Sequence, residues 1–146
     1  SGVEGNRNSY DPSISGDGLL VEYVSYSDNL VPNDSNAFLD VFVHDRQSGI
    51  TTLESVSTSG AQGNNLSYGG TISADGRIVV FWSDANNLVS GDANPYCDVF
   101  VHDRLTGVTG LVSLDVSGGP ANEGSWPATL SADGRFVAFA FAVGGR

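Results

Sequence analysis

The chain has 146 residues with 17 acidic and six basic side chains, and its formal net charge of −11 excludes a protein that binds nucleic acid through a basic face. It contains no run of about 18 apolar residues, so we expect no membrane span, and its first residues lack the basic and apolar segments of a signal peptide. One cysteine, Cys97, excludes an internal disulfide framework, and a hydrophobic content of 40% excludes a disordered acidic tail.

The first predicted element is a short strand followed by a tight turn. It covers residues 12–15 and recurs at 70–73 and 127–131. The turn that follows reads SGDG at 15–18 and SADG at 73–76 and 131–134. An Asp-Gly pair between apolar runs predicts a hairpin, because Gly accepts a positive φ and Asp tolerates one.

Three further strands follow in each full unit. The second covers 19–25, 77–83 and 135–141 and is rich in Val, Phe and Tyr, as buried strands are. After a polar loop comes the third, 40–46 and 98–104, and then the fourth, 51–57 and 109–115. No segment shows a period of 3.6 residues, so we expect almost no helix.

These elements belong to a repeat of 58 residues. Laying 1–58 on 59–116 without a gap gives 28 identities in 58 positions, and the run DVFVHDR recurs at 40–46 and 98–104. The chain therefore divides into repeats 1–58 and 59–116 and a partial repeat 117–146 that holds the first two strands. Four antiparallel strands per repeat predict an all-β chain of β-propeller blades, two complete and one partial. A small sandwich would not explain the gapless period.

Two kinds of run recur in the repeats: SADGRIVVF (73–81) with SADGRFVAF (131–139), and NLVPNDSNAFLDVFVHDRQSG (29–49) with NLVSGDANPYCDVFVHDRLTG (87–107). The first kind resembles the WD-like repeat of TolB-type β-propellers, and the second resembles a bacterial subset of those repeats. The resemblance covers the whole chain. It implies the fold rather than one function, because such repeats serve both as interaction platforms and as accessory domains of enzymes.

The loop before the third strand carries the candidate metal ligands. Oxygen-bearing side chains recur there with the spacing D-x-N-x-x-x-D, at Asp34, Asn36 and Asp40 and at Asp92, Asn94 and Asp98. Calcium takes about six to eight oxygen ligands, so this spacing is compatible with a calcium cofactor. The same residues also suit a turn without any cofactor, because Asp and Asn side chains bind nearby backbone N–H groups. Both interpretations stay open.

Other polar residues favour structural roles. His44 and His102 are equivalent by repeat and should lie about one blade apart, too far to share a metal. Asp45 and Asp103 end the third strand, and we expect them to cap turns or pair with Arg. Cys97 takes the place of Leu39 and is expected to be a small buried hydrophobe.

The two tryptophans, Trp82 and Trp126, are expected to pack in the core or between blades rather than to bind sugar. No nucleophile elbow, HExxH motif, phosphate loop or dinucleotide fingerprint occurs, so we expect no enzyme activity in this chain.

The partial repeat predicts interaction surfaces. Its missing strands leave 135–141 as an open edge, and the two end blades each leave an apolar face bare. We therefore expect self-association through blade faces and this edge strand, or a piece of a longer propeller. The favoured function is a non-catalytic binding or scaffold module for a protein or small-molecule ligand. Alternatives are an accessory propeller of a larger hydrolase and a calcium-dependent module of the cell exterior. For the protein as a whole, an extracellular or periplasmic location is favoured.

Overall fold

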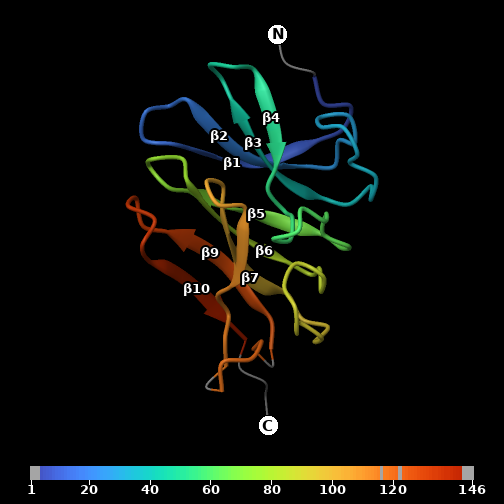
Figure 1. Ribbon diagram of the computed structural model, residues 1–146, viewed down its shortest axis with the longest axis vertical. Helices are drawn as coiled ribbons and strands as arrows, with labels where there is room; N and C mark the ends of the chain where they lie inside the picture. The colour runs from blue at the N-terminus through green and yellow to red at the C-terminus, as the bar shows by residue number, and fades with distance from the viewer. Residues whose placement is uncertain (1–3, 116, 122, 143–146) are drawn as a thin grey trace.

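The computed structural model describes residues 4–115, 117–121 and 123–142, which form three antiparallel sheets (Figure 1). The first sheet contains β1 (Ser9–Ile14), β2 (Leu20–Ser25), β3 (Asp40–Asp45) and β4 (Ile50–Leu53). The second contains β5 (Ser67–Ile72), β6 (Ile78–Ser83), β7 (Asp98–Asp103) and β8 (Val108–Leu111). The third contains β9 (Ser125–Leu130) and β10 (Val137–Phe141). No helix with the length and hydropathy of a membrane span occurs in the described ranges.

The predicted all-β class, with two four-stranded sheets and one partial sheet, is confirmed. The repeat boundaries themselves stay a prediction. The fourth strands end earlier than predicted, at Leu53 and Leu111, because the chain then leaves the sheet to form a separate turn closed by the bridge between Val56 and Gln62. The first strands begin about three residues earlier than predicted.

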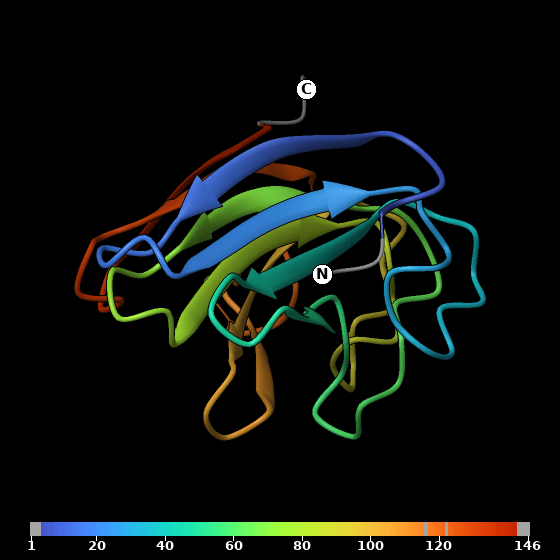
Figure 2. The ribbon, with the colours of Figure 1, turned by 90° about the horizontal axis from the view of Figure 1, so that it is seen from above.

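The sheets stack face to face in chain order, and their strands have similar orientations (Figure 2). Because side chains alternate across a strand, the second sheet offers one apolar face to each of its two neighbours. Val41 and Val43 of the first sheet pack on Val79, Phe81 and Phe100 of the second, and all five are fully buried. On its other face the second sheet packs through Val80 and Val99 against Ala128 of the third.

Backbone hydrogen bonds join successive sheets at equivalent places. Ser67 N–H donates to the Leu39 carbonyl at 2.7 Å, and Ser125 N–H donates to that of Cys97 at 2.8 Å. At the opposite ends of the strands, Gly16 N–H donates to the Ala74 carbonyl, and Ala74 N–H to that of Ala132, both at 2.8 Å. Hydrogen bonds thus hold neighbouring sheets together at both ends of their first strands, β1, β5 and β9.

The Asp-Gly turns follow the sequence prediction. In the second sheet, the Asp75 carboxylate accepts hydrogen bonds from the Ser73 hydroxyl at 2.6 Å and from Arg77 N–H at 3.1 Å, and these bonds lower the pKa of Asp75. Gly76 has a φ of 73°, which is the left-handed region that glycine enters without strain.

The tryptophan prediction is half correct. Trp82 stacks on Tyr68 with ring centroids 5.9 Å apart and contacts the core between the second and third sheets. Trp126 is 47% exposed, because no further described strand covers the third sheet there. Cys97 is half-buried, and burial raises the pKa of its thiol.

One glycine tests the packing of β5 on β6. A Cβ atom added at Gly70 would overlap the carbonyl oxygen of Val80, whereas a Cβ atom added at Gly110 in β8 would have no neighbouring atom within 4 Å. We predict that Gly70→Ala lowers the free energy of unfolding by about 3 kcal/mol, because backbone must move. Gly110→Ala is the matched control and should be near neutral in the same urea titration. Equal effects of the two variants would contradict the register of β5 on β6.

Candidate functional site

The first acidic loop is held by a glutamine. Gln62 Nε2 donates to Asp34 Oδ1 at 2.7 Å and to Asp40 Oδ2 at 3.0 Å, so one amide joins the two carboxylates. Asp40 is fully buried and accepts a second bond from the Ser55 hydroxyl at 2.6 Å, and burial raises its pKa to about 6. Asn36 Oδ1 accepts a hydrogen bond from Phe38 N–H at 2.8 Å, as in an Asx turn. In this loop a protein amide joins two of the three candidate calcium ligands, and the calcium and turn interpretations both stay open.

The second loop lacks that amide. Asp98 accepts hydrogen bonds from the Ser113 hydroxyl at 2.6 Å and from Asn94 Nδ2 at 2.9 Å. Asp92 is 7% exposed, and its Oδ1 has no hydrogen-bond partner among the described residues. The position of Gln62 is taken by Pro120, which has no donor. Burial raises the pKa of Asp92 to about 6, and the nearby charge of Asp98 adds to the shift.

No group of three or more His, Cys, Asp or Glu side chains in the described part of the chain is arranged to hold a metal ion. The binding of calcium at these two loops, which would also use Asn and backbone oxygens, stays a prediction. The structure brings Asp34 and Asp40 together through Gln62, and it places Asp92 near Asp98 without a joining group.

The two loops should respond differently to pH and calcium. The raised pKa of Asp92 means that its folded form holds a proton more tightly than the unfolded form, so this contribution to stability is lost as pH rises from about 4 to about 6. We predict that Asp92→Asn and Pro120→Gln each raise stability at pH 7, on the order of 1 kcal/mol, with little effect at pH 4.

Thermal melting with added CaCl₂ or chelator completes this measurement. If calcium binds, it should raise the Tm of the wild-type chain but not that of Asp92→Asn. Asp34→Asn is the matched control, because Gln62 can still donate to the new amide oxygen. A Tm of the wild-type chain that calcium leaves unchanged would remove the calcium interpretation.

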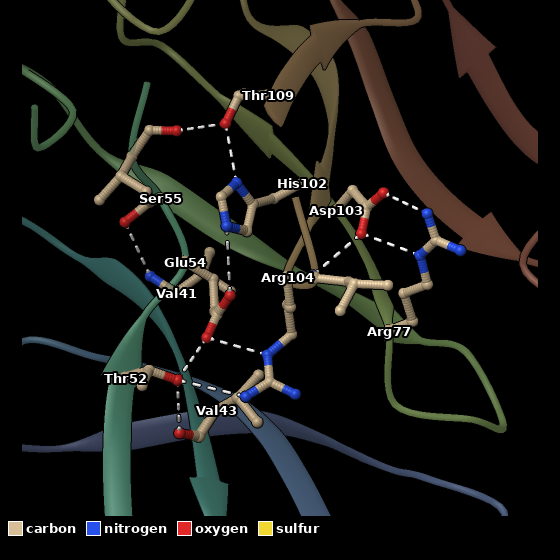
Figure 3. Close-up of polar contacts among 12 residues, drawn as sticks. Val41, Val43, Thr52, Glu54, Ser55, Arg77, His102, Asp103, Arg104 and Thr109 are labelled. Carbon is tan, nitrogen blue, oxygen red and sulfur yellow. Dashed lines mark hydrogen bonds and ion pairs between the residues drawn. The ribbon is translucent and has the colours of Figure 1, made fainter. Parts of the chain in front are cut away.

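A buried polar cluster lies between the first two sheets, and Glu54 is its centre (Figure 3). Glu54 follows β4, and its side chain is 3% exposed. Its Oε1 accepts a hydrogen bond from Arg104 Nε at 3.2 Å and another from the Thr52 hydroxyl. Its Oε2 lies 3.7 Å from Nε2 of His102. We call Glu54, Thr52, His102, Arg104 and Thr109 the Glu54 cluster.

The tautomer of His102 follows from its neighbours. Thr109 donates its hydroxyl hydrogen to the Val56 carbonyl, so its oxygen accepts from His102 Nδ1–H at 2.8 Å. Nε2 of the neutral ring then carries no hydrogen, which fits its 3.7 Å separation from the Glu54 carboxylate. Burial is the main cause that lowers the pKa of His102. The positive charge of Arg104 lowers this pKa further, and the negative charge of Glu54 raises it in part.

Arg104 and Asp103 point to different partners. Arg104 Nη1 donates to the Gly76 carbonyl at 2.8 Å, while Asp103 pairs with Arg77 of its own sheet at 2.7 Å. This pairing with Arg was one of the two roles predicted for Asp103, and it lowers the pKa of the Asp103 carboxyl. Asp45 accepts from Gln47 N–H at 2.8 Å and so caps its turn, the other predicted role.

Glu22 and Glu54 were not among the residues predicted to form a site. Glu22 in β2 is fully buried, and its Oε2 has no hydrogen-bond partner in the described ranges. Burial raises the pKa of Glu22 to about 8, so it is largely protonated at pH 7. In the second repeat these positions hold Val80 and Val112, so the sequence did contain a signal: two acids at positions where the other repeat has valine.

The Glu54 cluster should contribute measurable coupling. We predict a coupling free energy of about 1–3 kcal/mol between Glu54→Ala and Arg104→Ala in a double-mutant cycle, because the Glu54 carboxylate is buried. The more exposed pair Arg77–Asp103, with 46% and 18% exposed side chains, is the control and should give a smaller coupling, because solvent screens the two charges. Urea unfolding measures both cycles, and a smaller coupling for the Glu54 pair would contradict this view of the interface.

Comparisons with known proteins support the fold. No family model and no curated protein matches the chain. Among solved structures, a protein described as a TolB of Agrobacterium tumefaciens aligns with a TM-score of 0.63 and 19% identity over 94% of this chain. TolB of Acinetobacter baumannii aligns with a TM-score of 0.36 and 14% identity over 94% of this chain and 38% of its own. The chain spans 39% of the length of the Agrobacterium protein. The chain has the fold of TolB-type β-propeller blades, two complete and a third represented by its first two strands.

Proposed function

We propose that the chain is a non-catalytic protein-binding module that associates by adding its sheets to others. The observation that carries this proposal is the β10 edge. Among the described residues β10 pairs with β9 alone, whereas each complete sheet has four strands. Phe136 and Phe141 beside or on this strand are 64% and 65% exposed. An exposed strand edge flanked by aromatic side chains is a template for pairing with another strand.

The buried chemistry of the chain supports a non-catalytic role. Glu54 accepts a hydrogen bond from Arg104 across the interface, and His102 binds Thr109 within the second sheet, so these polar groups are engaged inside the protein. Asp40 and Asp98 likewise accept hydrogen bonds from Ser55 and Ser113, which follow the fourth strands of the same sheets. These groups serve packing rather than presenting a nucleophile or base to solvent.

The occupant that we propose for the β10 edge is a second copy of the chain. Antiparallel pairing of β10 with β10 of another copy would give the order β9-β10-β10-β9, a four-stranded sheet of the same size as the complete ones. Such an isologous contact closes as a dimer and leaves no further edge on β10.

Light scattering tests this association. We expect the molar mass of the wild-type chain to rise toward that of a dimer between low and high micromolar concentration. Ala138 and Ala140 are exposed on β10, so the double variant Ala138→Lys/Ala140→Lys should stay monomeric and folded, because edge lysines oppose strand pairing.

The control is Gln47→Lys, a charge change on an exposed turn of the first sheet, which should associate like the wild type. A wild-type chain that stays monomeric at high concentration would contradict the proposed function. Association that survives the β10 lysines would place it elsewhere on the molecule and would also contradict the proposal.

A further inference from the structure

We propose that the free face of the first sheet binds another propeller sheet that supplies a carboxylate, in the way that Glu54 supplies one to the second sheet. We define the free face as the surface of the first sheet turned away from the second, with Val21, Tyr23, His44, Arg46 and Thr51. The inference rests on the proposed binding function and names the partner at the opposite end of the stack from β10.

The free face is hollowed, and no described strand packs on it. Its five residues line one shallow depression, together with parts of residues 4–9 and Leu30. His44 is half-buried and Arg46 is exposed, whereas the equivalent His102 is 6% exposed. Glu4 also lines the depression, yet it makes no ion pair with His44 or Arg46 among the described residues.

The polar groups of the free face have the same internal geometry as their equivalents in the second sheet. His44 Nδ1 lies 3.0 Å from the Thr51 hydroxyl, as His102 Nδ1 lies 2.8 Å from that of Thr109. Arg46 Nη1 donates to the Gly18 carbonyl at 2.8 Å, as Arg104 Nη1 donates to that of Gly76 at 2.8 Å. The receiving half of the interface therefore forms without its partner.

The interface between the first two sheets shows what the free face lacks. Glu54 binds Arg104 Nε, the Val56 carbonyl accepts from the Thr109 hydroxyl, and Thr58 Oγ1 accepts from Thr109 N–H at 3.0 Å. A docked sheet would have to offer Arg46 a carboxylate and Thr51 a carbonyl and a hydroxyl. The required partner is a propeller sheet whose fourth strand is followed by an acidic residue, as in ITTLESVST at 50–58.

The second sheet of this chain does not meet that requirement. Val112 stands at the position of Glu54 and Gly110 at that of Thr52. A copy that docked through its second sheet would leave Arg46 without a carboxylate. The structure thus favours a sheet of the first type as occupant of the free face.

The test adds such a sheet to the intact chain. We would extend the 146-residue chain at its N-terminus with another copy of residues 1–58, so that the junction reads Thr58-Ser1-Gly2, matching Thr58-Ser59-Gly60. Docking should raise the Tm by about 5 °C or more, because a bare face becomes buried. It should also slow hydrogen exchange at the Thr51 amide at least tenfold, since Thr58 of the added copy would accept from it.

Two variants of the extended chain isolate the carboxylate. Glu54→Val in the added copy reproduces the valine of the second repeat, and we expect it to lose at least half of the gain in Tm. Arg46→Ala in the original chain should abolish the difference in Tm between the extended chains with and without the Glu54→Val substitution. Arg7→Ala, which changes an exposed arginine paired with Asp28, is the control and should leave that difference intact.

The outcomes separate this inference from the proposed function. If the extended chains with glutamate and with valine are equally stable, the free face does not recognise a carboxylate and the inference is wrong. If protease removes the added repeat as readily as an unfolded tail, no docking occurs and the inference is also wrong. Neither result bears on light scattering of the 146-residue chain, which decides the proposed function on its own.

Discussion

Face-to-face stacking of sheets is the constraint on which the rest of this structure depends. A four-stranded sheet has two faces, and the central strands of the second sheet are apolar on both, with Val79 and Phe81 on one side and Val80 on the other. Such a sheet cannot bury both faces alone, so its stability comes from its neighbours. The hydrogen bonds that join Leu39 to Ser67 and Cys97 to Ser125 repeat because the same stacking repeats.

The two interfaces of the stack use different chemistry in one geometry. Between the second and third sheets, Val80 and Val112 contribute to an apolar contact. Between the first and second, Glu22 and Glu54 take those positions, and the Glu54 carboxylate binds Arg104. A buried ion pair adds little net stability, because desolvation of the two charges offsets their attraction. The ion pair instead determines which sheets can stack on each other, since a sheet that buries a glutamate needs a neighbour with a matching cation.

Much of the fold could be predicted from the sequence because the relevant signals are local. Alternation in DVFVHDR and the Asp-Gly turns set the strands and their order, and the period of 58 residues set their number. Strand ends were less accurate, since the end of β4 depends on the turn closed by Val56 and Gln62.

The candidate site was harder to predict, because its contacts join distant residues. The spacing of Asp34 and Asp40 indicated oxygen ligands but gave no sign that Gln62 would join them from 22 residues beyond Asp40. Glu54 and His102 come together only when one sheet lies on the next, 48 residues further along the chain. Local pattern carries no information about which face of one repeat meets which face of another.

In this chain the positions that break the repeat, rather than those that keep it, carry the distinctive chemistry. Residues common to both repeats, such as the His–Thr pair and the buried Asp at the start of the third strand, make the same contacts twice and build the frame. Gln62 with Pro120, and Glu54 with Val112, place different side chains at equivalent points of that frame. With Pro120 in place of Gln62, a buried oxygen of Asp92 has no hydrogen-bond partner among the described residues. Glu54, where the second repeat has Val112, gives Arg104 its carboxylate partner. A gapless alignment of the repeats therefore locates the residues on which loop chemistry and sheet order depend.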